Sequence, residues 1–489
     1  MKKIILSLLA LTSLTAYAQF GAPRQNPTVP SVTENVVEDF KPASSNQDNK
    51  QYPMVNSQRM VRAQISAPNA TAVGLDIAGK IYSMTKDENG VWTGTSEPQD
   101  EGFHYYQLNI DGASVPDPGS LYYYGASRWG SGIEIPSADQ DFWQVKNVPQ
   151  GSVSEVFYWS TYTEKMRRCH VYLPAEYFTN PTKKFPVLYL QHGMGENEYG
   201  WAEQGHTAQI LDNLIAQGKA VPCIIVMDNG LNTQRPGEQG GFGGFGGGPR
   251  PQGAPGAGPR GQRPANVQEA LQRPTGAQGD QRPQGAPGQG GPRRGGFGGF
   301  GGPRPQGAQG APQGQRPQGM PQGGQRPQGG QRPQGAPGQG GQRRGGFGGF
   351  GGFSEGFKNV LFNDIIPMVE KNYRVIADPQ HRAYAGLSMG GMQAREITLA
   401  NPDKFAYVGS FSSGAWNVDQ VKGSEGFAKN VKLLFMSGGG KENMGCVDAA
   451  KNIKEQLGMN AVGYESPGTA HEWHTWRRSL FEFAQLMFK

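Results

Sequence analysis

A serine set between glycines is the first feature of this sequence that could do chemistry. Gly386-Leu-Ser388-Met-Gly390 follows a short run of small and apolar residues and precedes a segment typical of a helix, 392–400. A strand, a tight turn and a helix in that order lift a serine hydroxyl above a sheet and point a helix N-terminus at it. A serine held in this way can act as a nucleophile in acyl transfer. We therefore expect Ser388 to be a catalytic nucleophile, with an ordinary loop serine as the alternative.

The same pattern of glycines around a serine occurs a second time, at Ser354. That copy spans 352–356 and follows a run of glycines, with no strand-like segment before it. A nucleophile on such a turn needs a strand before it and a helix after it. The context therefore favours Ser388.

A serine hydroxyl becomes a good nucleophile when a histidine takes its proton, and the histidine needs a carboxylate to fix its tautomer. In α/β-hydrolases the acid and then the histidine follow the serine along the chain. Two histidines follow Ser388, and they are His471 and His474. His471 comes directly after the last predicted strand and a turn of small residues, so we expect it to be the general base. His474 is the alternative.

The carboxylate partner is specified less sharply than the histidine. A strand predicted at 432–436 is followed by a glycine run and then by Glu442. We predict Glu442 as the acid because it lies on a loop at the end of a strand. Asp419 and Glu425 are alternatives, whereas Asp448 falls on the next predicted helix.

Two backbone amides are needed to stabilise the oxyanion that forms during acyl transfer. Met389 follows the nucleophile directly and should supply one of them. Met194 should supply the other, because the glycines in His192-Gly-Met-Gly195 free the backbone to turn inward. We expect His192 itself to be a structural loop histidine.

The cysteines point to neither a metal centre nor a disulfide framework. Cys169, Cys223 and Cys446 are too few for a framework, and at most one pair could form. Their spacing is not that of a metal site. We expect buried free thiols, no metal and no cofactor.

Alternating strands and helices must position these residues. Nearly continuous apolar strands are predicted at 184–191 and 223–227, with helices at 208–218 and 357–373. Strands that are apolar on both faces indicate a parallel sheet covered by helices on both sides. The sequence thus predicts an α/β fold, an α/β-hydrolase domain, over 153–489.

The N-terminal third is predicted to hold a leader, a linker and a small all-β domain. Residues 1–18 have two lysines, a short apolar run and an Ala-Tyr-Ala end, as in a secretory signal peptide. We expect an exported protein, periplasmic or extracellular, with no transmembrane segment. Residues 19–52 are polar and proline-containing and predict a disordered linker. Regular turns between short strands over 53–145 predict a β-sandwich.

The sandwich contains aromatic residues that could stack on sugars, in the Tyr122–Tyr124 run and at Trp129. The alternative is that most of its aromatics fill the core or the joint between domains. The Tyr122–Tyr124 run and Trp129 are expected to be exposed and to face the second domain.

A low-complexity insert of Gly, Pro, Gln and Arg interrupts the second domain over 231–353. Between Arg235 and Phe350 there are fourteen arginines and three acidic residues, a net charge of +11 within a chain whose total is +6. So few apolar residues cannot offset the entropy of folding, and a disordered insert is predicted. We expect no nucleic acid partner, while contact with polyanions through the arginines is an alternative.

Four segments resemble carbohydrate esterase family 1, which includes feruloyl esterases, acetylxylan esterases and relatives of enterochelin esterase. They are 186–195, 211–216, 386–391 and 471–476. The resemblance covers 153–489 without the insert and implies Ser388 as nucleophile, His471 as base, and Met194 and Met389 as oxyanion donors. The family's acid is usually an aspartate, where this chain has Glu442. The sandwich resembles early-set immunoglobulin-like modules related to glycogen-binding domains.

These observations and the resemblance predict a secreted serine esterase that cleaves feruloyl or acetyl esters from plant polysaccharides, as in xylan degradation, with a polysaccharide-linked or small aryl ester as substrate. Two alternatives stay open. One is a carbohydrate-binding or surface-attachment protein with a weakly active or vestigial hydrolase domain, and the other is a siderophore-ester hydrolase. The presence of a carboxylate within reach of His471 would distinguish an enzyme from a binding protein.

Overall fold

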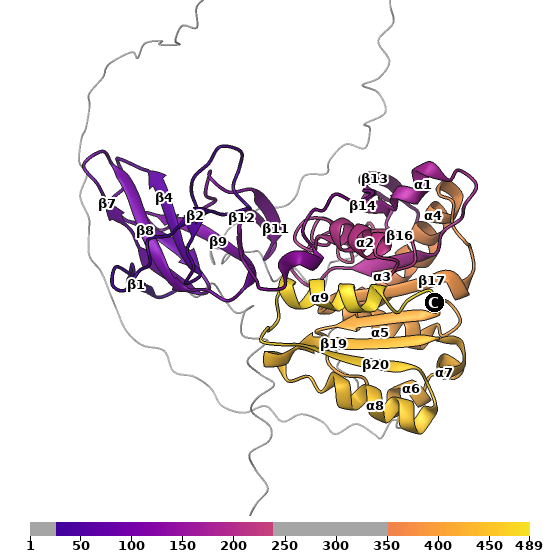
Figure 1. Cartoon of the computed structure of the whole chain (residues 1–489). Helices are drawn as coiled ribbons and strands as arrows, with labels where there is room; N and C mark the ends of the chain where they lie inside the picture. Colours follow the sequence, from indigo (N-terminus) through magenta and orange to yellow (C-terminus); the bar gives the residue numbers. More distant parts are fainter. Residues whose placement is uncertain (1–25, 238–350) are drawn as a thin grey trace, which may run out of the picture. The chain divides into compact units, whose positions relative to one another are not determined.

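A central sheet of eight strands, in the order β13-β14-β16-β15-β17-β18-β19-β20, organises the larger part of this computed structural model (Figure 1). Strands β13 and β14 are antiparallel to their neighbours. The other six strands, β15 to β20, are parallel to one another. The strands are β13 (Ser152–Ser160), β14 (Lys165–Leu173), β15 (Val187–Gln191), β16 (Ile224–Asp228), β17 (Arg382–Leu387), β18 (Tyr407–Phe411), β19 (Leu433–Gly439) and β20 (Ala461–Ser466). All the parallel strands therefore end at one edge of the sheet.

Helices cover both faces of this sheet. On one face, a buried cluster joins the sheet to α3, α4, α5 and α8, and on the other a second cluster joins it to α2 and α9. The helices are α1 (Ala175–Thr179), α2 (Thr207–Ala216), α3 (Gly351–Val360), α4 (Ile366–Asn372), α5 (Met389–Ala400), α6 (Val418–Lys422), α7 (Phe427–Asn430), α8 (Cys446–Leu457) and α9 (Trp473–Ala484). Short 3₁₀ turns lie at Gln140–Phe142, Pro379–His381 and Gly440–Glu442. The predicted α/β-hydrolase fold is confirmed.

The helix predicted as one piece over 357–373 is divided. A π-helical turn, Leu361–Ile365, separates α3 from α4. Pro367 lies at the start of α4. Proline has no N–H to donate to the preceding helical turn. The π-helical turn accommodates this missing hydrogen bond. Ser354, the second serine between glycines, is buried within α3 and does not lie on a turn that begins a helix.

Two further sheets precede the central one. The seven-stranded sheet has the order β1-β6-β5-β9-β12-β11, with β10 paired to β9, and the five-stranded sheet has the order β2-β3-β4-β8-β7. Their strands are β1 (Thr28–Pro30), β2 (Lys41–Pro42), β3 (Met54–Val55), β4 (Met60–Ser66), β5 (Val73–Ile77), β6 (Lys80–Ser83), β7 (Thr85–Lys86), β8 (Val91–Pro98), β9 (Gly102–Ile110), β10 (Ala113–Val115), β11 (Tyr122–Gly125) and β12 (Arg128–Ile135). A shared buried core, with Ala63 from β4 and Leu108 from β9, packs one sheet on the other.

The prediction of a disordered linker over 19–52 is wrong for residues 26–52. Strand β1 pairs in parallel with β6, and β2 pairs with β3. The amide of Val32 also donates to the carbonyl of Thr95 at 3.0 Å. The partners of β1 and Val32 lie far along the chain, so the polar composition of the segment did not indicate them.

The structure describes residues 26–237 and 351–489, and all of these belong to one compact unit. The predicted signal peptide (1–18), residues 19–25 and most of the predicted insert (238–350) lie outside the described residues. At the insert's edges, Gly351–Phe353 begin α3, and the carbonyl of Asn232 accepts a hydrogen bond from Arg167 at 3.1 Å. In the part of the chain that is described, no helix has the length and apolar character needed to cross a membrane. The three cysteines are buried and free, as predicted.

A buried ion pair joins the N-terminal sheets to the last helix. Arg477 of α9 makes two hydrogen bonds to Glu134 of β12, at 2.7 and 2.9 Å, and its Nε donates to the carbonyl of Gln204 at 2.6 Å. The side chains of Arg477 and Glu134 are 0% and 7% exposed. The guanidinium also lies 4.6 Å from the ring centre of Trp143. Both charges are thus paired away from water, and loss of one partner leaves the other charge buried and uncompensated.

Replacing Glu134 by Ala should therefore lower the free energy of unfolding by about 3–5 kcal/mol. Chemical and thermal unfolding followed by circular dichroism measure the change. Glu97→Ala is the matched control, because Glu97 pairs with Lys80 on the surface of the same sheets, with side chains 51% and 41% exposed. An exposed pair is worth at most about 1 kcal/mol. Equal stability of Glu134→Ala and the wild-type chain would contradict the role given to this pair.

Candidate active site

Ser388 lies on a strained turn between β17 and α5. Its backbone has φ 52° and ψ −114°, a conformation that costs free energy in a residue with a side chain and occurs mostly at functional sites. The amide of Ser388 donates to the carbonyl of Phe411 at 2.7 Å, which fixes the turn on the neighbouring strand. A Cβ at Gly390 would lie 2.6 Å from the carbonyl oxygen of Gln191. The turn therefore requires glycine after the serine, since any side chain there would collide with β15.

The structure brings Ser388, His471 and Glu442 together. Nε2 of His471 lies 2.9 Å from Oγ of Ser388, and Nδ1 of the same ring lies 2.8 Å from Oε1 of Glu442. The three residues come from the C-terminal ends of β17, β20 and β19, which lie at one edge of the parallel sheet. With the proton on Nδ1, the ring donates to Glu442 and accepts from the serine hydroxyl at Nε2. This arrangement can remove the hydroxyl proton of Ser388.

Glu442 is held in its ionised form by hydrogen bonds. Its side chain is 7% exposed, and its Oε2 accepts from Oγ of Ser412 at 2.6 Å and from the amide of Gly439 at 2.7 Å. Burial by itself would raise the pKa of Glu442. The hydrogen bonds from His471, Ser412 and Gly439 outweigh burial, so the pKa lies below its ordinary value of 4.5. The carboxylate can therefore stabilise a positive charge on His471.

The end of β19 packs directly against the loop that carries His471. β19 extends to Gly439, beyond the predicted end at 436, because its last residues pair with β20. A Cβ at Gly439 would lie 2.4 Å from the carbonyl oxygen of Thr469 and 2.6 Å from that of Ala470. Glycine at this position allows the strand carrying the acid and the loop carrying the histidine to meet.

The two predicted donor amides belong to segments that lie beside Ser388. Met389 is the first residue of α5, where the backbone N–H groups have no partner within the helix. A Cβ at Gly193 would lie 3.3 Å from Cβ of Ser388, so the loop containing Met194 reaches the serine. His192 is buried, and burial lowers its pKa to about 4. The neutral ring can donate from Nδ1 to the carbonyl of Gly193 (2.7 Å) and accept at Nε2 from the amide of Gly230 (3.1 Å). It fixes the loop, as a structural histidine would.

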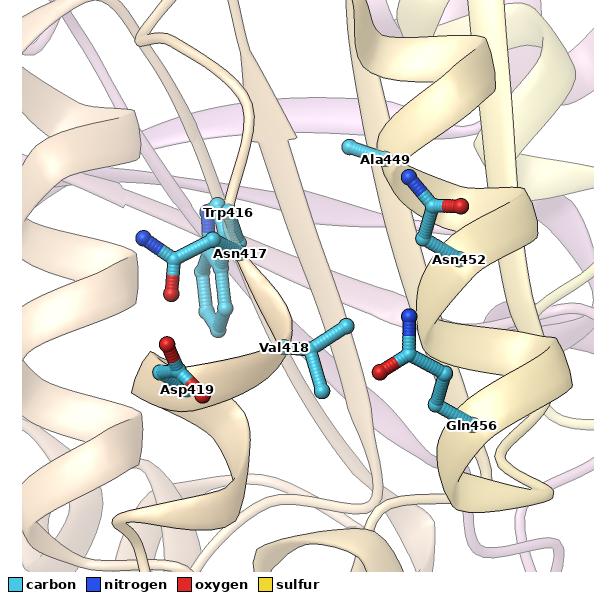
Figure 2. A pocket seen from close by; sticks show the side chains of 7 residues that line it. All are labelled: Trp416, Asn417, Val418, Asp419, Ala449, Asn452 and Gln456. Atoms are coloured by element: carbon cyan, nitrogen blue, oxygen red, sulfur yellow. The ribbon is translucent and has the colours of Figure 1, made fainter.

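The alternative residues lie elsewhere. His474 is buried in α9, its Nε2 lies 3.2 Å from Oδ1 of Asp139, and burial lowers its pKa to about 4. Asp419 lines a cavity of about 340 Å³ between α6 and α8, together with Trp416 and Gln456 (Figure 2). Glu425 and Asp448 are exposed. In the contacts of the described residues, the ring of His471 meets Glu442 and none of these alternatives.

Ser412 was not singled out by the sequence. It follows β18, has φ 48°, and its amide donates to the carbonyl of Ser437 at 2.7 Å. This backbone conformation turns the hydroxyl toward Glu442. The Ser412-Ser413-Gly414 sequence follows a predicted strand and could have indicated a residue near the site. It does not indicate that the hydroxyl of Ser412 bonds to Glu442. Among the described residues, no group of three or more His, Cys, Asp or Glu side chains could hold a metal ion.

Comparison with known proteins identifies the family. The family model described as "Esterase: Putative esterase" matches residues 160–241 and 315–486, a little more than half of the chain. The chain belongs to this esterase family. It is also 34% identical over 460 residues to an endo-1,4-beta-xylanase/feruloyl esterase of Xylanibacter ruminicola. That match covers 92% of this chain but 48% of the relative, so the chain spans about half the relative's length.

Solved structures similar to this esterase-family chain include two esterases at low sequence identity. A ferulic acid esterase of Anaeromyces mucronatus in complex with ferulic acid has a TM-score of 0.43 and 17% identity, over 72% of this chain and 96% of that chain. The enterobactin esterase of Shigella flexneri has a TM-score of 0.49 and 12% identity, over 87% of this chain and 92% of that chain.

A buried carboxyl lies on the same loop as Met194. Both oxygens of Glu196 lie within 3.0 Å of the hydroxyl of Tyr105, a residue of β9. The same hydroxyl accepts hydrogen bonds from Nε2 of Gln204 at 2.7 Å and from Nε1 of Trp473 at 3.2 Å. Burial raises the pKa of Glu196 to about 8, although the bond from Tyr105 opposes this. Glu196 is therefore protonated at neutral pH, and it links the loop to the N-terminal sheets.

Glu196→Gln should make the stability of this esterase-family chain less dependent on pH. The unfolded chain releases the Glu196 proton near the ordinary value of 4.5, whereas the folded chain holds it to about pH 8. The folded state therefore loses relative stability as the pH rises through this range. The melting temperature of the variant relative to wild type should rise between about pH 5 and about pH 8.5. The exposed Glu88→Gln is the control, and a constant difference for Glu196→Gln would contradict a protonated Glu196.

Proposed function

We propose that this chain is an exported serine esterase that hydrolyses feruloyl or acetyl esters carried by plant polysaccharides. The hydrogen bonds from Ser388 to His471 (2.9 Å) and from His471 to Glu442 (2.8 Å) carry the proposal. A histidine between a serine on a strained turn and an ionised carboxylate is the arrangement that activates a serine for acyl transfer. The alternative of a binding protein with a vestigial hydrolase domain requires that no carboxylate lies within reach of His471. The 2.8 Å contact to Glu442 argues against that alternative.

The reaction that we propose proceeds through an acyl-enzyme. His471 accepts the proton of Ser388 at Nε2 while Oγ attacks the carbonyl carbon of the ester. The oxyanion that results is stabilised by the amides of Met194 and Met389. The protonated His471, stabilised by Glu442, gives its proton to the leaving alcohol. Water, activated by the same histidine, then releases the acid from Ser388.

Three observations support a polymeric substrate outside the cytoplasm. The side chain of His471 is 43% exposed, so the site opens to solvent and an ester carried on a large alcohol can reach it. The name of the relative from Xylanibacter ruminicola combines a xylanase with a feruloyl esterase. The first eighteen residues have the pattern of a secretory signal peptide.

Replacing Ser388 by Ala should abolish turnover of methyl ferulate and of acetylated xylan, while the melting temperature stays within a few degrees of wild type. The hydroxyl is the atom that forms the acyl bond, so the rate should fall at least about a thousandfold. Steady-state kinetics and thermal melting measure the two quantities. Full activity in Ser388→Ala would refute the proposed mechanism.

Ser412→Ala tests whether Ser412 positions Glu442. The change removes one hydrogen bond to a buried carboxylate, which is worth about 1.5 kcal/mol, so kcat should fall about tenfold with little change in KM. Ser413→Ala is the control, because the Ser413 hydroxyl bonds to Ser410 and not to Glu442. If the two variants have the same kcat, the hydroxyl of Ser412 does not act through Glu442.

A further inference from the structure

The hairpin of β13 and β14 leaves large apolar side chains open to solvent. Phe157 and Trp159 of β13 and Met166 of β14 are 60%, 57% and 59% exposed. In the antiparallel register Trp159 lies opposite Met166 and Phe157 lies opposite Arg168, so the four side chains share one face of the hairpin. Alternate residues of a strand are about 7 Å apart, which spaces the two rings along a line. Exposed apolar clusters of this kind mark binding surfaces.

Arg168 connects this face to Tyr199, which lies on the loop between β15 and α2. The guanidinium carbon of Arg168 lies 4.7 Å from the ring centre of Tyr199 and 6.0 Å from that of Phe157. We call Phe157, Trp159, Met166, Arg168 and Tyr199 the aromatic strip. Arg168 therefore joins the hairpin face to Tyr199 through contacts with two aromatic rings.

The strip leads toward Ser388. The ring of Tyr199 lies 5.2 Å, centre to centre, from that of Trp129 in β12. One residue before that strand, the amide of Ser127 donates to the carbonyl of Gly195 at 2.8 Å. Gly195 belongs to the loop that reaches Ser388 at Gly193. Met166 also lies toward the edge at which the parallel strands end, because Cys169, further along β14, pairs with Asp228 at the end of β16. The strip is thus connected, through Trp129 and the segment before it, to the loop beside Ser388.

The charges on the strip are already paired, which argues against a charged ligand. Arg168 contacts Glu198 at 2.6 Å and Glu155 at 3.2 Å, and the hydroxyl of Tyr199 donates to Glu155 at 2.7 Å. An anionic polymer would find two carboxylates beside the one guanidinium. A neutral ligand with many hydroxyl groups can stack on the rings and exchange hydrogen bonds with these polar groups.

The exposed area also argues against a second copy of this chain as the occupant. Stable protein interfaces bury about 800 Å² on each partner. The three most exposed side chains of the strip are Phe157, Trp159 and Met166, each slightly more than half exposed. Together they offer on the order of 400 Å² of accessible surface. The surface is long and narrow, and it suits a linear ligand better than a protein face.

We propose that the aromatic strip binds the neutral main chain of the polysaccharide whose ester is presented to Ser388. This inference rests on the proposed function for the identity of the polymer. The strip holds sugar units that do not react, and it thereby raises the local concentration of the ester at the site. Its contribution is to binding of polymeric substrates and not to the chemical step.

The test separates binding from hydrolysis. Binding of unsubstituted xylan to the Ser388→Ala chain is measured by affinity gel electrophoresis, with Trp159→Ala and Phe157→Ala added in turn. In the chain with Ser388 intact, the same variants are assayed on acetylated xylan and on methyl ferulate. Phe178→Ala is the matched control, because Phe178 is 58% exposed but lies on α1.

We expect Trp159→Ala and Phe157→Ala to weaken xylan binding and to raise KM on acetylated xylan about tenfold, with turnover of methyl ferulate unchanged. Phe178→Ala should leave both unchanged. The proposal is overturned if Trp159→Ala binds xylan like its parent. It is also overturned if Phe178→Ala weakens binding equally, or if size-exclusion chromatography shows a dimer that Trp159→Ala dissociates. Xylan binding through Trp159 in a chain without esterase activity would refute the proposed function and leave the strip as a polysaccharide site.

Discussion

The hydrogen bond between His471 and Ser388 joins positions 83 residues apart, and much of the fold serves to make that bond. The parallel strands end at one edge of the sheet, which places the residues after β17, β19 and β20 close to one another. Two glycines then allow the close approach. Gly390 lets the turn after β17 pack on β15, and Gly439 lets β19 meet the histidine loop. The geometry therefore depends on positions where a side chain would collide as much as on the three polar residues.

The N-terminal sheets take part in holding this geometry. Helix α9 begins two residues after His471, and its Arg477 is buried against Glu134 of β12. Tyr105 of β9 contacts Glu196, which lies on the same loop as Met194. The segments on both sides of Ser388 are thus tied to the same pair of sheets. Removing the N-terminal sheets would leave these buried charged and polar groups without their partners.

Local sequence patterns predicted the α/β-hydrolase fold and named Ser388, His471 and Glu442 as residues that should meet. The strand-turn-helix around Ser388 and the position of His471 after a strand are visible locally. The choice between Glu442 and Asp419 was harder, because the glycine run hides the true end of β19 at Gly439. Pairings over long separations were not predictable. Strand β1 finds β6 about fifty residues later, and Arg477 finds Glu134 across 343 residues. The hydroxyl of Ser412 reaches Glu442 because the backbone of Ser412 has a positive φ. The residue type alone does not predict that conformation.

The most direct test of the account is to find where the acyl group is attached during turnover. The chain is mixed with methyl ferulate, quenched in acid, digested, and mapped by mass spectrometry. We expect a feruloyl group on the peptide containing Ser388. A longer-lived adduct is expected when His471 is replaced by Ala and the chain is loaded with an activated feruloyl ester. Turnover of the ester with no adduct at Ser388, or with an adduct on another residue, would contradict the account.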